Sequence, residues 1–311
     1  MRVLVLGTLA ALTCQPVASA LAGEMPAEIA AAIKQIGPVI DPPATSKLFE
    51  PLQQKEPYRD VKVVRDEAYG SDPRQRLDLF TPSAAGAPRP VLIFVHGGGF
   101  TAGDKHPPGS PFYDNIMLWA VANGMVGVNM TYRLAPQHPW PAGAEDVAAA
   151  VAWTKANVSR LGGDPSRVFL MGHSAGAIHV ASYLAHPEFQ KAPSGGLAGA
   201  ILVSGLYEFN AGTNGPPQRA YFGEDLTKWP ERSSQKGLMA SKLPLLIMRA
   251  ELDPPVFVTQ NEALNKALCA SAGCPTYVVL RGHSHISEVD TINTQDTSVT
   301  DPIRAFVHRA R

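Results

Sequence analysis

The sequence lacks an excess of charge of either sign. Lys and Arg total 27, Asp and Glu total 27, and no run of like charge interrupts the 311 residues. Proteins that bind nucleic acid usually carry a basic stripe, so nucleic acid is not an expected partner. Glycine and proline, at 27 and 28 residues, are abundant but follow no period, which excludes a collagen-like chain. The 45% of hydrophobic residues indicate a globular protein with a substantial core.

Long apolar runs are also lacking, so no membrane span is expected. At the N-terminus, Arg2 precedes a short apolar stretch at residues 3–12, and small residues follow up to Ala20 and Ala22. This order is typical of a secretory signal peptide. We therefore expect a signal peptide over residues 1–22, cleaved near Ala20 or Ala22, and a secreted or periplasmic protein.

Cysteine is scarce, with three residues in the whole chain. Cys14 falls within the expected signal peptide, which leaves Cys269 and Cys274 as an even pair with four residues between them. Export permits disulfides, so this pair could pin a turn, and two free thiols are the alternative. A lone pair supplies only half the ligands of a structural zinc site, and no metal or other cofactor is expected.

Short apolar runs bounded by turn residues alternate with helical patterns through the rest of the chain. Alternation of this kind predicts crossover connections and a mostly parallel α/β sheet. We expect eight strands with an antiparallel start, near residues 61–64, 77–80, 91–95, 125–130, 168–171, 200–203, 245–248 and 277–280. The expected helices cover residues 27–36, 144–158, 175–184, 256–270 and 302–309.

Two segments depart from this alternation, residues 23 to about 60 and residues 205 to about 240. Long insertions in compact domains tend to be lids or binding elements, so both are predicted lid elements of one catalytic domain over residues 23–311. Aromatic residues can build a substrate pocket, although they can equally hold a lid to the body of the protein. The candidates for such a pocket are Phe100, Tyr207, Phe222 and Trp229.

The chemistry is concentrated in four short segments. The sequence GHSAG, centred on Ser174, follows an expected strand and opens an expected helix, a turn that projects a serine hydroxyl outward. A serine needs a base and an acid behind that base. Asp253 follows the next-to-last strand, with Glu251 as a rival, and His283 and His285 follow the last strand. The residues occur in the order serine, acid, histidine. Because each of them follows a strand, we expect all three at one edge of the sheet.

The fourth segment, HGGGF, leaves the strand at residues 91–95. Three consecutive glycines let the backbone approach a substrate closely. A phosphate-binding loop is disfavoured, because no Gly-Lys-Ser or Gly-Lys-Thr follows.

With HGGGF, GHSAG and the segment YRLAPQHPWP at residues 132–141, the chain resembles the α/β-hydrolase-fold serine esterases related to hormone-sensitive lipase. The resemblance covers roughly residues 60 to 310 and implies Ser174 as nucleophile and His285, followed by an apolar residue, as base. It also implies an oxyanion hole formed by Gly98, Gly99 and Ala175. The acid Asp253 matches the first residue of the family's Asp-Pro-Leu-x-Asp stretch, whereas the sequence after it, Pro-Pro-Val-Phe, departs from that pattern.

The resemblance implies a carboxylesterase that cleaves small-molecule esters, short-chain or aryl, through an acyl-enzyme. An amide hydrolase such as an arylformamidase or a peptidase would use the same residues, and a catalytically silent binding protein is a further alternative. The sequence does not decide the acyl-chain length, the alcohol or the oligomeric state.

Overall fold

An eight-stranded sheet organises the protein, whose computed structural model describes residues 23–84, 86–190, 193–271 and 273–309. The strand order is β1-β2-β4-β3-β5-β6-β7-β8. The β1–β2 and β2–β4 pairs are antiparallel and all other pairs are parallel, which confirms the predicted sheet. The strands are β1 (Val61–Ala68), β2 (Arg76–Pro82), β3 (Arg89–Val95), β4 (Val126–Met130), β5 (Gly163–His173), β6 (Gly199–Val203), β7 (Leu245–Leu252) and β8 (Thr276–Ser284).

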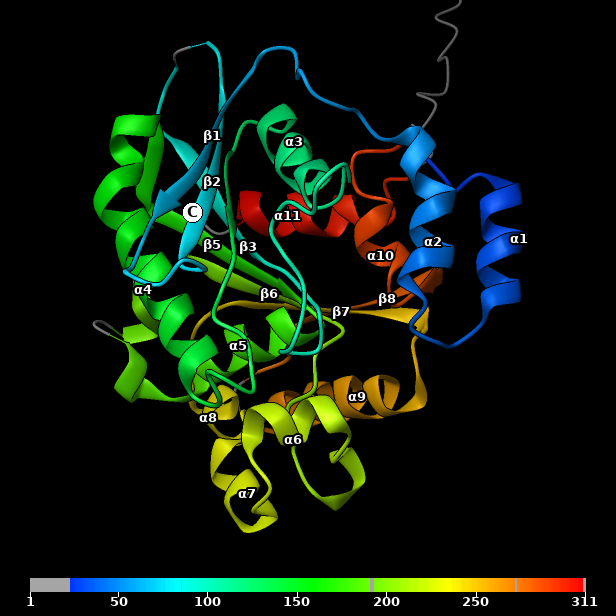
Figure 1. Ribbon diagram of the computed structural model, residues 1–311, viewed down its shortest axis with the longest axis vertical. Coiled ribbons are helices and arrows are strands. Elements are labelled where there is room, and N and C mark those ends of the chain that lie inside the picture. The colour runs from blue at the N-terminus through cyan, green and yellow to red at the C-terminus, as the bar shows by residue number, and fades with distance from the viewer. Residues whose placement is uncertain (1–22, 85, 191–192, 272, 310–311) are drawn as a thin grey trace, which may run out of the picture.

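Helices cover both faces of the sheet, as expected for strands joined by crossovers (Figure 1). Each of the five expected helices is present, with ends that differ by a residue or two. The helices are α1 (Ala27–Ile36), α2 (Pro42–Phe49), α3 (Asp114–Ala122), α4 (Ala142–Asn157), α5 (Ala175–Ala185), α6 (Pro216–Phe222), α7 (Trp229–Arg232), α8 (Gln235–Ala240), α9 (Pro255–Ser271), α10 (Ser287–Asp290) and α11 (Thr300–Arg309). None of these helices is both long and apolar enough to cross a membrane.

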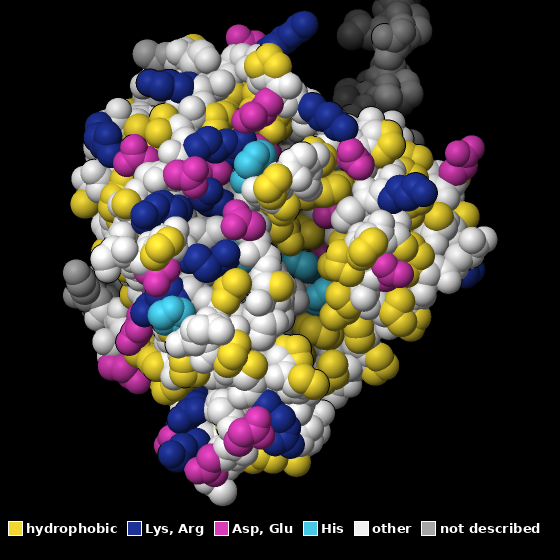
Figure 2. Space-filling model, in the orientation of Figure 1, with side chains coloured by type: hydrophobic (Ala, Val, Ile, Leu, Met, Phe, Trp, Pro, Cys, Tyr) yellow, Lys and Arg dark blue, Asp and Glu magenta, His cyan; other side chains and the backbone are white. Residues whose placement is uncertain are grey.

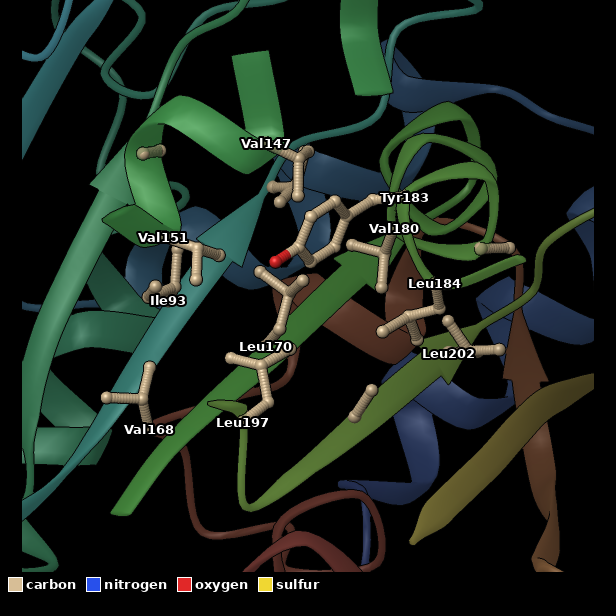
Figure 3. Close-up of a cluster of buried hydrophobic side chains, with 14 of the residues drawn as sticks. Ile93, Val147, Val151, Val168, Leu170, Val180, Tyr183, Leu184, Leu197 and Leu202 are labelled. Atoms are coloured by element: carbon tan, nitrogen blue, oxygen red, sulfur yellow. The ribbon is translucent and has the colours of Figure 1, made fainter. Parts of the chain in front are cut away.

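The alternation of side chains along the central strands creates two cores. On one face, Ile93 and Leu170 pack against Val147 and Val151 of α4 and Val180 of α5 (Figure 3). On the other face, the strands pack against α3 and α11. Because the parallel strands are covered on both faces, they read as continuous apolar runs in the sequence.

The two segments that interrupt the alternation lie at the carboxyl ends of the strands. The N-terminal segment forms α1 and α2, and α2 packs against α10 (Figure 1). The insertion between β6 and β7 forms α6, α7 and α8. A disulfide joins Cys269 at the end of α9 to Cys274, while the predicted signal peptide lies outside the described residues.

Candidate active site

Ser174 occupies a sharp turn between β5 and α5. Its φ of 54° lies in a region that L-residues rarely adopt, and the flanking glycines make the turn sterically possible. A Cβ on Gly172 would lie 2.5 Å from the carbonyl oxygen of Gly176, and a Cβ on Gly176 would lie 2.1 Å from that of Val95. The sequence GHSAG therefore fixes a backbone that presents the serine hydroxyl at the end of the strand.

His285 and Asp253 complete a hydrogen-bonded series with this serine. Nε2 of His285 lies 2.9 Å from Oγ of Ser174, and Nδ1 lies 2.7 Å from Oδ1 of Asp253. The Oδ2 atom of Asp253 accepts hydrogen bonds from the Ser204 hydroxyl at 2.6 Å and the Ala250 amide at 3.0 Å. Both side chains are buried, so the imidazole is held in one orientation toward the serine.

The structure separates the rival residues from this series. The carboxylate of Glu251 is partly exposed and accepts hydrogen bonds from Arg281 and from the Gly282 amide. The ring of His283 points away from Ser174, with Nε2 2.9 Å from Oγ of Ser298 and 3.2 Å from a carboxylate oxygen of Asp296. Neither residue contacts the serine.

The glycine loop after β3 lies beside Ser174. Gly98 and Gly99 have φ values of 121° and 59°, which favour glycine, and both line the same pocket as Ser174 and Ala175. His96 supports the loop, because its ring packs against Tyr132 with centroids 4.3 Å apart and its Nδ1 lies 2.6 Å from the Gly97 oxygen. Burial lowers the pKa of His96 to about 4, so the ring is neutral near pH 7.

Ala175 is the first residue of α5, where backbone N–H groups have no partner within the helix. The loop and the helix start thus border the serine together. An arrangement of this kind can stabilise negative charge that develops on a carbonyl oxygen.

Two buried residues that were not among the predicted site residues lie behind the histidine. His173 directs Nε2 to the carbonyl oxygen of His285 at 2.8 Å and to Oε1 of Glu288 at 3.2 Å. Burial, and then the neighbouring Asp253, raise the pKa of Glu288 well above its usual range. Burial also lowers the pKa of His173 well below its usual range, so both groups are neutral. The hydrogen bond of His173 attaches the His285 segment to the strand that carries Ser174.

Ser204 was also missed, although its position carried a signal. It directly follows β6, at the same sheet edge as Ser174, and that edge gathers polar groups in open α/β sheets. Nothing comparable marks Glu288, which belongs to a short helix after the last strand.

Histidine and carboxylate groups near the serine raise the question of a metal. Among the described residues, one group of possible ligands, His173, His285 and Glu288, has its ligand atoms within 4.8 Å of one another. Both ring nitrogens of His285 are already engaged by Ser174 and Asp253. This group therefore does not fit a metal while the serine and aspartate hold the histidine.

A pocket of about 700 Å³ opens above Ser174, and its walls come from both predicted lid segments. The N-terminal segment contributes Ile40 and Pro42, and the insertion contributes Pro217 and Gln218. Figure 2 shows histidine side chains inside this hollow, with hydrophobic side chains around it. The pocket suits a largely apolar ligand.

Of the four aromatic residues predicted for a pocket, only Phe100 lines this one. The prediction was wrong for Tyr207, Phe222 and Trp229, which are fully covered by other side chains. Phe222 packs between Phe100 and Trp229, with ring centroids 5.6 and 5.8 Å away. These rings hold the insertion to the body because burying them against one another removes more apolar surface from water than lining an open pocket would.

Fold and site together define a protein of the α/β-hydrolase fold, with a serine, a histidine and an aspartate in hydrogen-bonded order. Residues 77–197 match the family model BD-FAE. The chain is similar to the hormone-sensitive-lipase-like carboxylesterases, as its motifs predicted.

Two relatives illustrate this similarity. Esterase LipC of Mycobacterium tuberculosis is 34% identical over 167 residues, which are 51% of this chain and 40% of that protein. Carboxylesterase NlhH of the same species is 44% identical over 89 residues, 28% of this chain and 26% of that protein. The chain therefore spans less than half the length of either relative.

Solved structures agree on the fold over most of the chain. Esterase B from Lactobacillus Rhamnosis superposes with a TM-score of 0.70 at 21% identity, over 91% of this chain and 94% of that one. A bacterial heroin esterase gives a TM-score of 0.69 at 22% identity, over 91% and 98%. At these identities the likeness establishes the α/β-hydrolase fold.

Proposed function

We propose that this protein hydrolyses small-molecule carboxylic esters through an acyl-enzyme formed on Ser174. The observation that carries the proposal is the unbroken series of hydrogen bonds from the Ser174 hydroxyl through His285 to Asp253. A serine hydroxyl becomes an effective nucleophile when a neutral imidazole can take its proton.

In the proposed reaction, Nε2 of His285 removes the Ser174 proton while Oγ attacks the ester carbonyl carbon. The N–H groups of Gly98, Gly99 and Ala175 stabilise the oxyanion. The imidazolium then protonates the leaving alcohol as the carbon–oxygen bond breaks. Asp253 keeps the ring in the tautomer with a proton on Nδ1.

A water molecule repeats the sequence on the acyl-enzyme. His285 takes a proton from the water, whose oxygen attacks the acyl carbon, and the proton returns to the departing Oγ of Ser174. The products are a carboxylic acid, an alcohol and the free enzyme, so no cofactor is consumed. The largely apolar pocket supports an ester with an apolar acyl or alcohol portion.

Ser174→Ala tests the proposal directly. The variant should keep the thermal unfolding temperature of the wild type and lose nearly all turnover of p-nitrophenyl esters, because the nucleophile is gone. Labelling of the wild type, but not of the variant, by a fluorophosphonate would identify the reactive oxygen as that of Ser174. Matched ester and amide substrates separate an esterase from an amide hydrolase, and full esterase activity in Ser174→Ala would refute the mechanism.

The proposal includes export across the inner membrane after cleavage near Ala20 or Ala22. The charged start, apolar stretch and small residues of the first 22 positions support it, as does the Cys269–Cys274 disulfide, since oxidising compartments favour such bonds. Fractionation of expressing cells with N-terminal sequencing of the mature protein checks this part.

A further inference from the structure

The pocket above Ser174 contains an acidic group that the proposed mechanism does not use, the carboxyl of Asp290. Asp290 ends the short helix α10 and is 3% exposed, and it lines the pocket with Ser46 of α2 and Tyr113. Among the described residues that line the pocket there is no other carboxylate and no lysine or arginine. A buried carboxyl without a cation is unusual because its desolvation is not compensated.

The contacts of Asp290 leave part of its carboxyl available to the pocket. Oδ2 accepts a hydrogen bond of 2.6 Å from the Ser46 hydroxyl. Oδ1 has no hydrogen-bond partner within the described ranges and does not belong to the completely covered polar atoms there. The free oxygen of a side chain that lines a pocket is positioned to accept a hydrogen bond from a ligand.

Tyr113 and the protonation of Asp290 also support a site for a hydrogen-bond donor. Burial raises the pKa of Asp290 to about 7, so both forms of the carboxyl are populated near neutral pH. Burial, and then the charge of Asp290, raise the pKa of the Tyr113 hydroxyl, and both side chains line the same pocket. A ligand that donates a hydrogen bond would stabilise the ionised carboxylate, and a cationic donor would do so more strongly.

We propose that Asp290, Ser46 and Tyr113 form a polar subsite that binds a hydrogen-bond donor, a hydroxyl or an ammonium group, on the part of the ester remote from the carbonyl. The inference rests on the proposed ester hydrolysis and narrows its substrate class. The preferred substrates are esters of hydroxy or amino acids or of diols and amino alcohols. Esters with a remote carboxylate are disfavoured, because the substrate carboxylate would lie next to the Asp290 carboxylate with no cation to offset the repulsion.

The test compares substrates that differ only at the remote end. p-Nitrophenyl hexanoate and its ω-hydroxy and ω-amino counterparts probe the acyl side. Hexyl acetate and the O-acetates of the corresponding terminal diol and terminal amino alcohol probe the alcohol side. The measured quantity is the ratio of kcat/KM between the substituted and unsubstituted ester, so a general change in activity cancels.

Two Asp290 variants give different expected ratios. In Asp290→Leu, both the hydroxyl and the amino ratio should fall by about tenfold or more in at least one series, because a hydrogen bond to a charged group is lost. In Asp290→Asn, the hydroxyl ratio should fall by less than about threefold, since the amide oxygen still accepts, while the amino ratio falls by about tenfold. Asp296→Asn is the matched control, because Asp296 is equally buried but does not line the pocket, and it should keep the wild-type ratios.

The outcomes distinguish the subsite from the reaction. Calorimetric binding of the same esters to Ser174→Ala and to Ser174→Ala/Asp290→Leu measures the preference without turnover. Wild-type inactivity toward p-nitrophenyl hexanoate would contradict the proposed hydrolysis, and the calorimetric ratios would still decide the subsite. Ratios that neither Asp290 variant changes, on the acyl side or the alcohol side, would overturn the subsite.

Discussion

Nδ1 of His285 lies 2.7 Å from Oδ1 of Asp253, across the ends of the neighbouring strands β7 and β8. Glu251 precedes Asp253 by two residues, yet its carboxylate binds Arg281 and the Gly282 amide on the exposed side of the same strand pair. Two carboxylates that were close rivals in the sequence therefore have different partners.

This relationship gives a paired prediction. Asp253→Asn should lower kcat by about 10³- to 10⁴-fold, because an amide does not hold the imidazole in the reactive tautomer. Glu251→Gln should stay within roughly twofold of the wild type, since its partners are exposed and exposed ion pairs contribute little. Steady-state kinetics with a p-nitrophenyl ester measures kcat for both variants. A larger loss of kcat in Glu251→Gln than in Asp253→Asn would assign the role of the acid to Glu251 instead.

The glycine loop gives a second pair of variants. A Cβ on Gly98 would lie 2.1 Å from the carbonyl oxygen of Ala102, whereas a Cβ on Gly99 would meet nothing closer than Pro217 at 3.5 Å. Gly98→Ala should displace the loop and lower kcat by about 10²-fold or more, as loss of an oxyanion donor does. Gly99→Ala carries only the strain of a positive φ, about 1–2 kcal/mol, and should lose less. Equal losses would contradict this account of the loop.

The aromatic cluster under the insertion yields a prediction on stability. Trp229 is fully buried, and its indole N–H donates to the carbonyl oxygen of Gly223 at 3.0 Å. Trp229→Phe should lower the free energy of unfolding by about 1–3 kcal/mol through the lost hydrogen bond and ring volume. The acyl-chain preference should not change, because Trp229 does not line the pocket.

Phe100→Leu is the matched variant, since Phe100 does line the pocket. It should shift the preference among p-nitrophenyl esters of graded chain length. Chemical denaturation and a substrate panel on both variants separate the two effects. A changed preference in Trp229→Phe at unchanged stability would restore Trp229 as a substrate contact.

His179 predicts a specific pH dependence of stability. Its ring packs against Phe100, Tyr132 and Tyr221, and neither ring nitrogen has a partner within the described part of the chain. Burial lowers the pKa of His179 from 6.5 to about 3. The unfolded chain therefore takes up a proton as the pH falls below 6.5 while the folded protein does not, so stability is lost on the acid side.

The size of this effect follows from the shift. Between pH 7 and pH 4.5 the group should remove about 3 kcal/mol from the free energy of unfolding. In His179→Leu the loss of unfolding free energy between pH 7 and pH 4.5 should be smaller by about this amount. The difference between the two pH values cancels any change in packing that the substitution causes at pH 7. Urea denaturation at the two pH values measures the difference, and identical losses in both proteins would show that His179 is not buried as a neutral ring.

The sequence was sufficient to predict the sheet and the edge at which Ser174, Asp253 and His285 meet. Parallel strands end at one edge, so a residue directly after a strand is placed by topology alone, and Ser174, Asp253 and His285 all follow strands. Short-range patterns also fixed the turn at Ser174, because glycine spacing reflects local sterics.

The walls of the pocket and the helices beyond the five expected ones escaped prediction, and α3 shows a physical reason for this. Nearly every residue of α3 (Asp114–Ala122) is buried, so the helix has no polar face and no amphipathic period to reveal it. Phe100 and Phe222 are the same type of residue, yet Phe100 borders the pocket and Phe222 is enclosed by other side chains. Which ring is enclosed depends on the packing of α6 and α7, a long-range property that no local pattern records.

The contact between Ser46 and Asp290 joins residues that are 244 positions apart. Gln53 adds hydrogen bonds to the carbonyl oxygens of Asp290 and Ile292, so the segment of α2 rests on residues that are translated much later. A growing chain that stops before His285 lacks the imidazole and the support for α2 at once. The imidazole and the support for the enclosing wall are thus acquired together, when the segment that carries His285 and Asp290 is translated.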